Sequence, residues 1–212
     1  MKPAERLKNI IPIFEQNSPS PKTELEYIDP FQLTVAVILS AQCTDVRVNI
    51  VTPKLFKVFP TAEKMSKATL EEVFELIKSI SYPNNKAKHL IGMSKMLIQE
   101  FDNQLPSDIE LLQKLPGVGR KTANVLASVL FDKPAFAVDT HVFRVCNRIG
   151  LTKNAKNPLQ TEQQIMAIAD LNKIPDLHHW LILHGRYVCK ARKPLCEECF
   201  ISKFCNYYKS KE

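Results

Sequence analysis

The stretch LPGVGRKTANV, residues 115–125, decides the fold predicted for this chain. The whole sequence contains five glycines, and two of them, Gly117 and Gly119, stand here. A proline–glycine pair is typical of a helix end, and a helical pattern follows over about residues 121–130. We therefore expect a helix that ends near Leu115, a tight turn and a second helix, which together form a helix-hairpin-helix.

The turn of this hairpin is a candidate anion site. The backbone N–H groups of the Gly117-Val118-Gly119 turn and of the next helix's first turn lack partners within the helix, and the positive end of the helix dipole lies beside them. Such a set of donors suits a phosphate group. The alternative is an ordinary turn between two helices, which needs no ligand.

Two side chains near this turn are candidates for chemistry. Lys121 is expected in the first turn of the second helix, where the helix dipole and partial burial both favour the neutral, nucleophilic amine. Asp139 follows a short apolar run and precedes another helical pattern, so it is expected to cap that helix and can still face an amine. The alternatives are a solvated surface lysine and a plain N-cap.

Elsewhere the chain shows one helical pattern after another and no convincing alternating strand, so the predicted fold class is all-α. Four helix starts are marked by a cap followed by proline or by the spacing of a capping box, at Asp29–Pro30, Asn157–Pro158, Thr69 with Glu72, and Ser107 with Glu110. Cys43 and Cys146 stand in apolar helical stretches and are expected to be buried thiols.

The charge of the chain favours an anionic partner. Lys and Arg number 29 against 22 Asp and Glu, for a formal net charge of +7 and an isoelectric point near 9.1. No run approaches the roughly 18 apolar residues of a membrane span, and residues 1–17 interrupt any signal-peptide pattern with proline and acids. We therefore expect no membrane, and a cytoplasmic, nucleoid-associated protein, or a nuclear one if the source has a nucleus.

Four of the six cysteines follow the spacing Cys189-x6-Cys196-x2-Cys199-x5-Cys205. This spacing suits four thiolates around one metal centre, and on spacing alone both zinc and an iron–sulfur cluster are open. The loop between the first two cysteines is basic and is interpreted as a finger for a phosphate backbone, through Lys190, Arg192 and Lys193.

Five features in this order resemble the endonuclease III family of DNA repair glycosylases, within the helix-hairpin-helix superfamily. They are LSAQCTDVRVN (39–49), LPGVGRKTANV, FAVDTHVFRVCNR (136–148), HHWLILHGRYVC (178–189) and the four-cysteine spacing. The resemblance covers nearly the whole chain. It implies two helical domains with a DNA-binding cleft between them: a central domain, 23–133, that carries the hairpin, and a second domain, 1–22 plus 134–212, that carries the cysteines.

The resemblance also implies roles for single residues. Lys121 matches the catalytic lysine and Asp139 the catalytic aspartate, while the four cysteines match the ligands of a [4Fe-4S] cluster rather than zinc. Gln42 matches a glutamine that enters the duplex near the vacated base position. Further DNA contacts are implied at Gly117, Val118, Gly119, Arg120, His141, Lys190, Arg192 and Lys193.

The implied activity is that of a bifunctional DNA glycosylase and AP lyase of base excision repair. It flips out a damaged base, an oxidised pyrimidine in most of this family, removes it through a Schiff base on Lys121 and nicks the strand by β-elimination. The implied partner is double-stranded DNA with damaged bases or abasic sites, and we expect a monomer. The alternatives are an adenine- or mismatch-specific glycosylase on the same scaffold and a non-enzymatic helix-hairpin-helix module.

One departure from the family pattern concerns the duplex wedge. Many family members have G-L-Y ahead of N-x-K-A, whereas this chain has Ser81-Tyr82-Pro83. The leucine thought to wedge into the duplex is thus replaced by Tyr82, an aromatic residue that can fill the gap by stacking. The alternative is a turn tyrosine that packs against its own loop.

Overall fold

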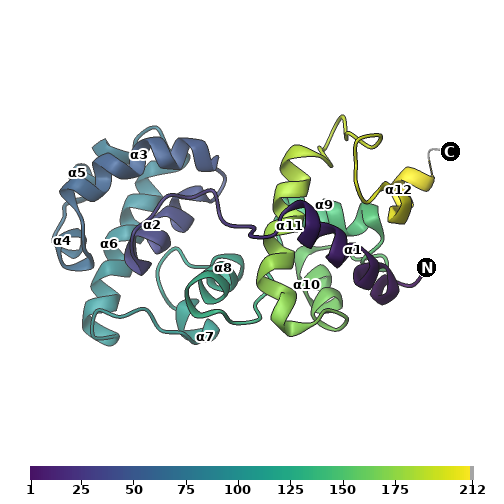
Figure 1. Cartoon of the computed structure of the whole chain (residues 1–212). Helices are drawn as coiled ribbons and strands as arrows, with labels where there is room; N and C mark the ends of the chain where they lie inside the picture. The colour runs from purple at the N-terminus through teal and green to yellow at the C-terminus, as the bar shows by residue number, and fades with distance from the viewer. Residues whose placement is uncertain (211–212) are drawn as a thin grey trace. The chain divides into compact units, whose positions relative to one another are not determined.

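A computed structural model describes residues 1–210, which contain helices and irregular segments and no strand (Figure 1). The predicted all-α class is therefore confirmed. None of the described helices combines the length and apolar character needed to cross a membrane. The chain divides into two compact units: one is continuous, Glu24–Phe131, and the other joins Met1–Thr23 to the chain from Asp132 onward. The predicted division into two domains, 23–133 and 1–22 plus 134–212, stays a prediction.

The continuous unit is built around one predominantly apolar and mostly buried helix. Its helices are α2 (Pro30–Ser40), α3 (Asp45–Val58), α4 (Ala62–Ser66), α5 (Leu70–Ile77), α6 (Pro83–Glu100), α7 (Ile109–Leu112) and α8 (Arg120–Phe131). Helix α2 is buried from Gln32 to Leu39 and contacts α3, α6 and α8. A helix that is buried on nearly all sides belongs inside a core, and α3, α6 and α8 pack around it.

The discontinuous unit combines the first helix with the C-terminal third of the chain. Its elements are α1 (Pro3–Asn17), α9 (Thr140–Ile149), α10 (Pro158–Met166), the 3-10 helix η1 (Leu171–Lys173), α11 (Ile174–Tyr187), the 3-10 helix η2 (Ser202–Phe204) and α12 (Asn206–Lys209). Helix α1, purple in Figure 1, buries Leu7, Ile10 and Phe14 in a core with α9 and α11. The Phe14 ring stacks on Trp180 at 5.7 Å between centroids.

Three of the four expected helix starts are confirmed. Asp29 and Asn157 each accept a hydrogen bond from the backbone three residues on, and Thr69 forms a complete capping box with Glu72. The Ser107 cap is wrong, because α7 starts one residue later and Asp108 accepts from the backbone N–H groups of residues 110 and 111 at 2.8 and 3.0 Å. Serine and aspartate are both favourable capping residues, and Ser107 and Asp108 are neighbours, so either could cap this helix.

Candidate nucleic-acid interface and iron–sulfur site

The two hairpin glycines have different structural roles. Gly117 has a φ of +82°, and a Cβ added there would lie 2.8 Å from the Cβ of His89 on α6. Only glycine satisfies both the left-handed backbone and this close approach. Gly119 lies outside the left-handed region, and a Cβ added there would meet nothing within 4 Å. Gly117 therefore shapes the turn, and Gly119 keeps its outer surface open.

The open surface continues into the first turn of α8. Gly119, Arg120 and Lys121 are all exposed, whereas Val118 is buried and donates its N–H to the carbonyl of Leu115 at 3.0 Å. The first helix of the hairpin ends at Leu112, earlier than expected, and the second begins at Arg120. The backbone around Gly119 is thus accessible from solvent at the start of a twelve-residue helix. An anion bound at this turn stays a prediction.

Lys121 is exposed, so the partial burial expected from the sequence is wrong. Helix α8 buries a face that includes Ala123, Leu126 and Ala127. At 100° per residue, Lys121 stands on the opposite side of the helix from these residues.

Asp139 is the N-cap of α9, as predicted. Its Oδ1 accepts a hydrogen bond from the backbone N–H of Val142 at 2.7 Å, and its side chain is half-buried. His141, in the first turn of the same helix, is half-buried, and its Nδ1 lies 3.2 Å from Arg144 Nη2. Asp139 belongs to the discontinuous unit and Lys121 to the continuous one.

Gln42 and Tyr82 lie on two loops that hydrogen bonds join. Ser81 Oγ donates to the backbone carbonyl of Gln42 at 2.8 Å. Both Gln42 and Tyr82 have left-handed backbones, with φ of 54° and 55°, and both are exposed. Tyr82 is 61% exposed, so the alternative of a tyrosine packed against its own loop is wrong.

The two remaining cysteines differ in environment. Cys146 is buried within α9, as predicted, and burial raises the pKa of its thiol. Cys43 is half-buried and lies in the turn between α2 and α3, so its placement in a helix was wrong. The apolar pattern of α2 ends three residues earlier, at Ser40.

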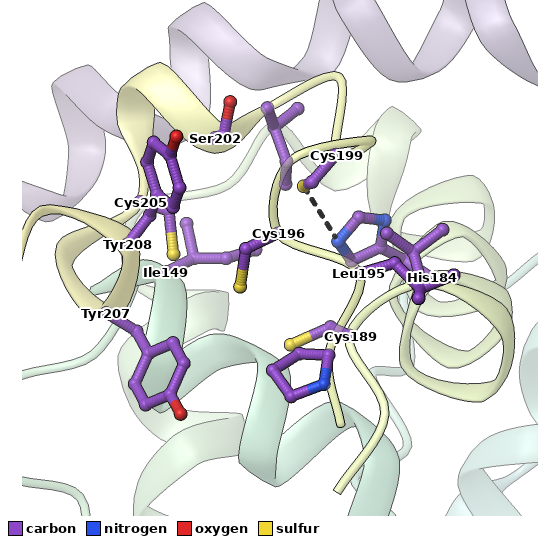
Figure 2. Close-up of a pocket in the computed structure, with 13 residues that line it drawn as sticks. Ile149, His184, Cys189, Leu195, Cys196, Cys199, Ser202, Cys205, Tyr207 and Tyr208 are labelled. Atoms are coloured by element: carbon purple, nitrogen blue, oxygen red, sulfur yellow. Dashed lines mark hydrogen bonds between the residues drawn. The ribbon is translucent and has the colours of Figure 1, made fainter. Parts of the chain in front are cut away.

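The four C-terminal cysteines line one pocket in the discontinuous unit (Figure 2). Cys189 follows the end of α11, Cys196 and Cys199 lie on the loop beyond it, and Cys205 separates η2 from α12. The six cysteines form no disulfide within the described chain. No three of the described His, Cys, Asp or Glu side chains are gathered closely enough to hold a single metal ion. The thiols instead share the walls of a hollow whose other lining is largely apolar, with Ile149, Leu195 and Ile201 among it.

The chemistry of this pocket fits an iron–sulfur cluster. Burial raises the pKa of Cys199 to about 11, and it also raises the pKa of Cys205. Thiolates in such surroundings require a compensating positive charge, which bound iron supplies. His184 on α11 is buried, and its Nε2 lies 3.6 Å from Cys199 Sγ, as the dashed line in Figure 2 marks. Burial lowers the pKa of His184 to about 4, so the ring is neutral and can donate one N–H to a cluster ligand.

Two arginines that the sequence did not single out hold the basic loop. Arg148 donates to the backbone carbonyls of Lys190 and Ala191 at 2.7 and 2.8 Å, and its Nη1 lies 3.6 Å from Cys189 Sγ. Arg144 donates to the carbonyl of Cys189 at 3.1 Å. The expected loop cations, Lys190, Arg192 and Lys193, are all exposed. The spacing of Arg144 and Arg148, four residues apart on α9, is the signal in the sequence that both face the loop.

Comparison with known proteins assigns this architecture. Residues 35–170 match the family model described as "HhH-GPD superfamily base excision DNA repair protein", and residues 189–205 match the "Iron-sulfur binding domain of endonuclease III". The chain is 51% identical to endonuclease III of Rickettsia conorii over 205 residues, which cover 97% of each protein. It is 45% identical to endonuclease III of Escherichia coli K12 over 207 residues, which cover 98% of this chain and 97% of that protein.

Solved structures agree with the sequence relatives. A trapped covalent intermediate of endonuclease III with DNA superposes with a TM-score of 0.94 at 39% identity, covering 100% of this chain and 99% of that one. A thermostable thymine-DNA glycosylase has the same fold, with a TM-score of 0.87 at 24% identity, covering 97% of this chain and 98% of that one. The chain therefore belongs to the endonuclease III family, the DNA glycosylases and AP lyases of base excision repair, and its cofactor is the [4Fe-4S] cluster.

Proposed function

We propose that Lys121 is the nucleophile of this enzyme and Asp139 its catalytic carboxylate. The observation that carries this proposal is the exposed Lys121 in the first turn of α8, directly after the open surface at Gly119. A strand bound by its phosphate at this turn brings the sugar of a flipped nucleotide to the amine. The relative trapped as a covalent DNA intermediate supports an amine that attacks the sugar.

The reaction then follows from the chemistry of an amine and a carboxylate. The Lys121 nitrogen forms a bond to C1′ as the bond from C1′ to the damaged base breaks, and the base leaves with a proton. The Asp139 carboxylate, oriented by the hydrogen bond that it accepts from the Val142 N–H, stabilises positive charge at the sugar and relays the proton that the lysine loses to the departing base. The sugar ring then opens as its oxygen takes a proton from water, which gives a protonated imine between Lys121 and C1′.

Strand nicking uses the same imine. Its positive charge acidifies the C2′ proton, and loss of that proton expels the 3′ phosphate by β-elimination. Water then releases Lys121 from the cleaved product. When bound, the [4Fe-4S] cluster ties the four thiolates Cys189, Cys196, Cys199 and Cys205 into one folded segment.

The binding residues divide into two kinds. Gly119 and Arg120 at the hairpin, and the exposed cations Lys190, Arg192 and Lys193, contact phosphates and supply affinity without sequence preference. Gly117 shapes the turn, and Val118, which is buried and donates its N–H to Leu115, supports it from within. His141, in the first turn of α9, joins them beside Asp139. Gln42 and Tyr82 enter the duplex at the place the base leaves, where the aromatic ring stacks between neighbouring bases.

The proposed substrate is double-stranded DNA that contains an oxidised or ring-saturated pyrimidine or an abasic site. The enzyme acts on it as a monomer, at the nucleoid, or in the nucleus of a eukaryote. An adenine- or mismatch-specific preference is the alternative that a panel of lesions decides. The replacement of leucine by Tyr82 changes the group that fills the vacated stack, so opposite-base preference is the property most open to change.

Borohydride trapping tests the nucleophile. Wild-type protein, Lys121→Gln and the control Lys95→Gln, which alters an exposed lysine on α6, are incubated with abasic duplex and with duplexes that carry a reduced pyrimidine, an adenine mismatch or no lesion. We expect a covalent adduct from the wild type and the control on abasic and pyrimidine-lesion DNA, and none from Lys121→Gln. An adduct with Lys121→Gln would refute this role, and excision confined to the adenine mismatch would refute the pyrimidine assignment.

A further inference from the structure

Lys86 on α6 has an unusual environment for a lysine. Its side chain is buried, with the residue only 5% exposed. Its ammonium group donates to the carbonyl of Leu39 at 2.9 Å, the carbonyl of Ala41 at 2.6 Å and the hydroxyl of Ser81 at 3.2 Å. All three acceptors are neutral, and burial lowers the pKa of Lys86, although the nearby Cys43 thiol raises it.

The acceptors join two segments that are far apart in the sequence. Leu39 and Ala41 are at the end of α2, where helix carbonyls lack partners and the dipole attracts a cation. Ser81 is in the loop that leads into α6. Because Ser81 also donates to the carbonyl of Gln42, the two loops and the ammonium group form one hydrogen-bonded set.

Two exposed residues with left-handed backbones directly follow these contacts. Gln42 follows Ala41, Tyr82 follows Ser81, and both have positive φ although neither is a glycine. A left-handed backbone costs a residue with a Cβ free energy, and Tyr82 also precedes a proline, which disfavours helical backbone conformations further. Such conformations persist where surrounding contacts hold them. Here the contacts that hold both converge on Lys86.

Stability alone does not account for a charged group at this position. Burying an ammonium ion without a carboxylate costs solvation, and an apolar side chain of similar length avoids that cost. The charge is useful if it organises the two loops before DNA arrives, because a preorganised surface spends less of its interaction energy on ordering.

We propose that Lys86 is a positioning residue that holds Gln42 and Tyr82 together in the conformations with which they enter the duplex. This inference rests on the proposed role of those two residues. It assigns Lys86 no contact with DNA and no part in the chemistry. Loss of its ammonium group therefore weakens recognition of the lesion and leaves contacts with phosphates unchanged.

The test compares Lys86→Met with Lys86→Arg and with Lys88→Met, which alters an exposed lysine on the same helix. Each variant is titrated with two duplexes of one sequence, an undamaged one and one that contains a tetrahydrofuran abasic analogue opposite 2-aminopurine. The fluorescence of 2-aminopurine reports unstacking of the opposite base. We expect the affinity of Lys86→Met for the abasic duplex to be about tenfold lower than that of the wild type, equivalent to ~1.4 kcal/mol. We also expect this variant to lose the rise in 2-aminopurine fluorescence.

In Lys86→Met, the affinity for the undamaged duplex and the iron content should equal those of the wild type. Lys86→Arg should regain part of the fluorescence rise. Lys88→Met should behave as the wild type in every measurement. Equal loss on both duplexes would indicate a merely structural role and overturn the inference, as would unchanged binding to the abasic duplex. If Lys86→Met does not fold, Ser81→Ala decides, because it removes the link to Gln42 and should show the same selective loss. Absent borohydride trapping by the wild type would instead refute the proposed function.

Discussion

Substitution of Gly117 by alanine should destabilise the hairpin strongly. The added Cβ would lie 2.8 Å from the His89 Cβ, which is fixed to the backbone of α6 and cannot rotate away. Relief of such overpacking costs typically 1–3 kcal/mol. The φ of +82° adds roughly 1–2 kcal/mol for a residue with a Cβ. The sum is about 2–5 kcal/mol, which for a chain of this size lowers the melting temperature by about 4–20 °C.

Gly119→Ala is the matched control, since its Cβ would meet nothing within 4 Å. Its melting temperature, followed by circular dichroism at 222 nm, should stay close to that of the wild type, because an exposed substitution changes stability by at most about 0.5 kcal/mol. Its affinity for duplex DNA should fall, because the methyl group occupies the space proposed for a phosphate. This reasoning would be refuted if Gly117→Ala melted at the same temperature as the wild type. It would also be refuted if Gly117→Ala and Gly119→Ala lowered the melting temperature by the same amount.

Four further outcomes are expected. Asp139→Asn should keep the α9 cap and the melting temperature, because asparagine caps as well as aspartate, yet slow base release by on the order of 10²-fold; equal rates would contradict its role. Cys199→Ser should lower iron per protein, and full iron would remove it from the ligands. Lys193→Ala should flatten the salt dependence of duplex binding by about 0.9 in the log–log slope, against no change in the exposed-lysine control Lys8→Ala. Thr69→Ala should lower stability by about 1 kcal/mol in thermal unfolding, and an unchanged midpoint would contradict the importance of its capping box.

Local signals in the sequence predicted local structure well. The caps at Asp29 and Asn157 were found because a capping side chain and a following proline act within one turn of helix. The cap of α7 was missed by one residue because Ser107 and Asp108 both suit the position, and only the start of the helix decides between them. The exposure of Lys121 was missed for a related reason, since it depends on which face of α8 packs.

The long-range contacts had no comparable signal. Nothing in the sequence distinguishes Lys86 from an ordinary surface lysine. Its burial depends on the carbonyls of Leu39 and Ala41, which folding brings to its ammonium group. His184 likewise lies in the motif HHWLILHGRYVC, residues 178–189, but its place beside Cys199 follows from how the loop after α11 folds back. The unusual environments of Lys86 and His184 are therefore recognised only in the folded structure, because their partners lie many residues away in the sequence.

The discontinuous unit has a consequence for the order in which the chain folds during synthesis. Helix α1 leaves the ribosome first, yet Phe14 packs on Trp180, and Arg6 hydrogen-bonds to the backbone of Ile149 and Phe204. The segment Glu24–Phe131 is one compact unit of continuous sequence and can fold while translation continues. Until α9 and α11 emerge, the apolar face of α1 has nothing to cover it. A chain interrupted before that point therefore exposes the apolar face of α1, which is a substrate for chaperones and proteases.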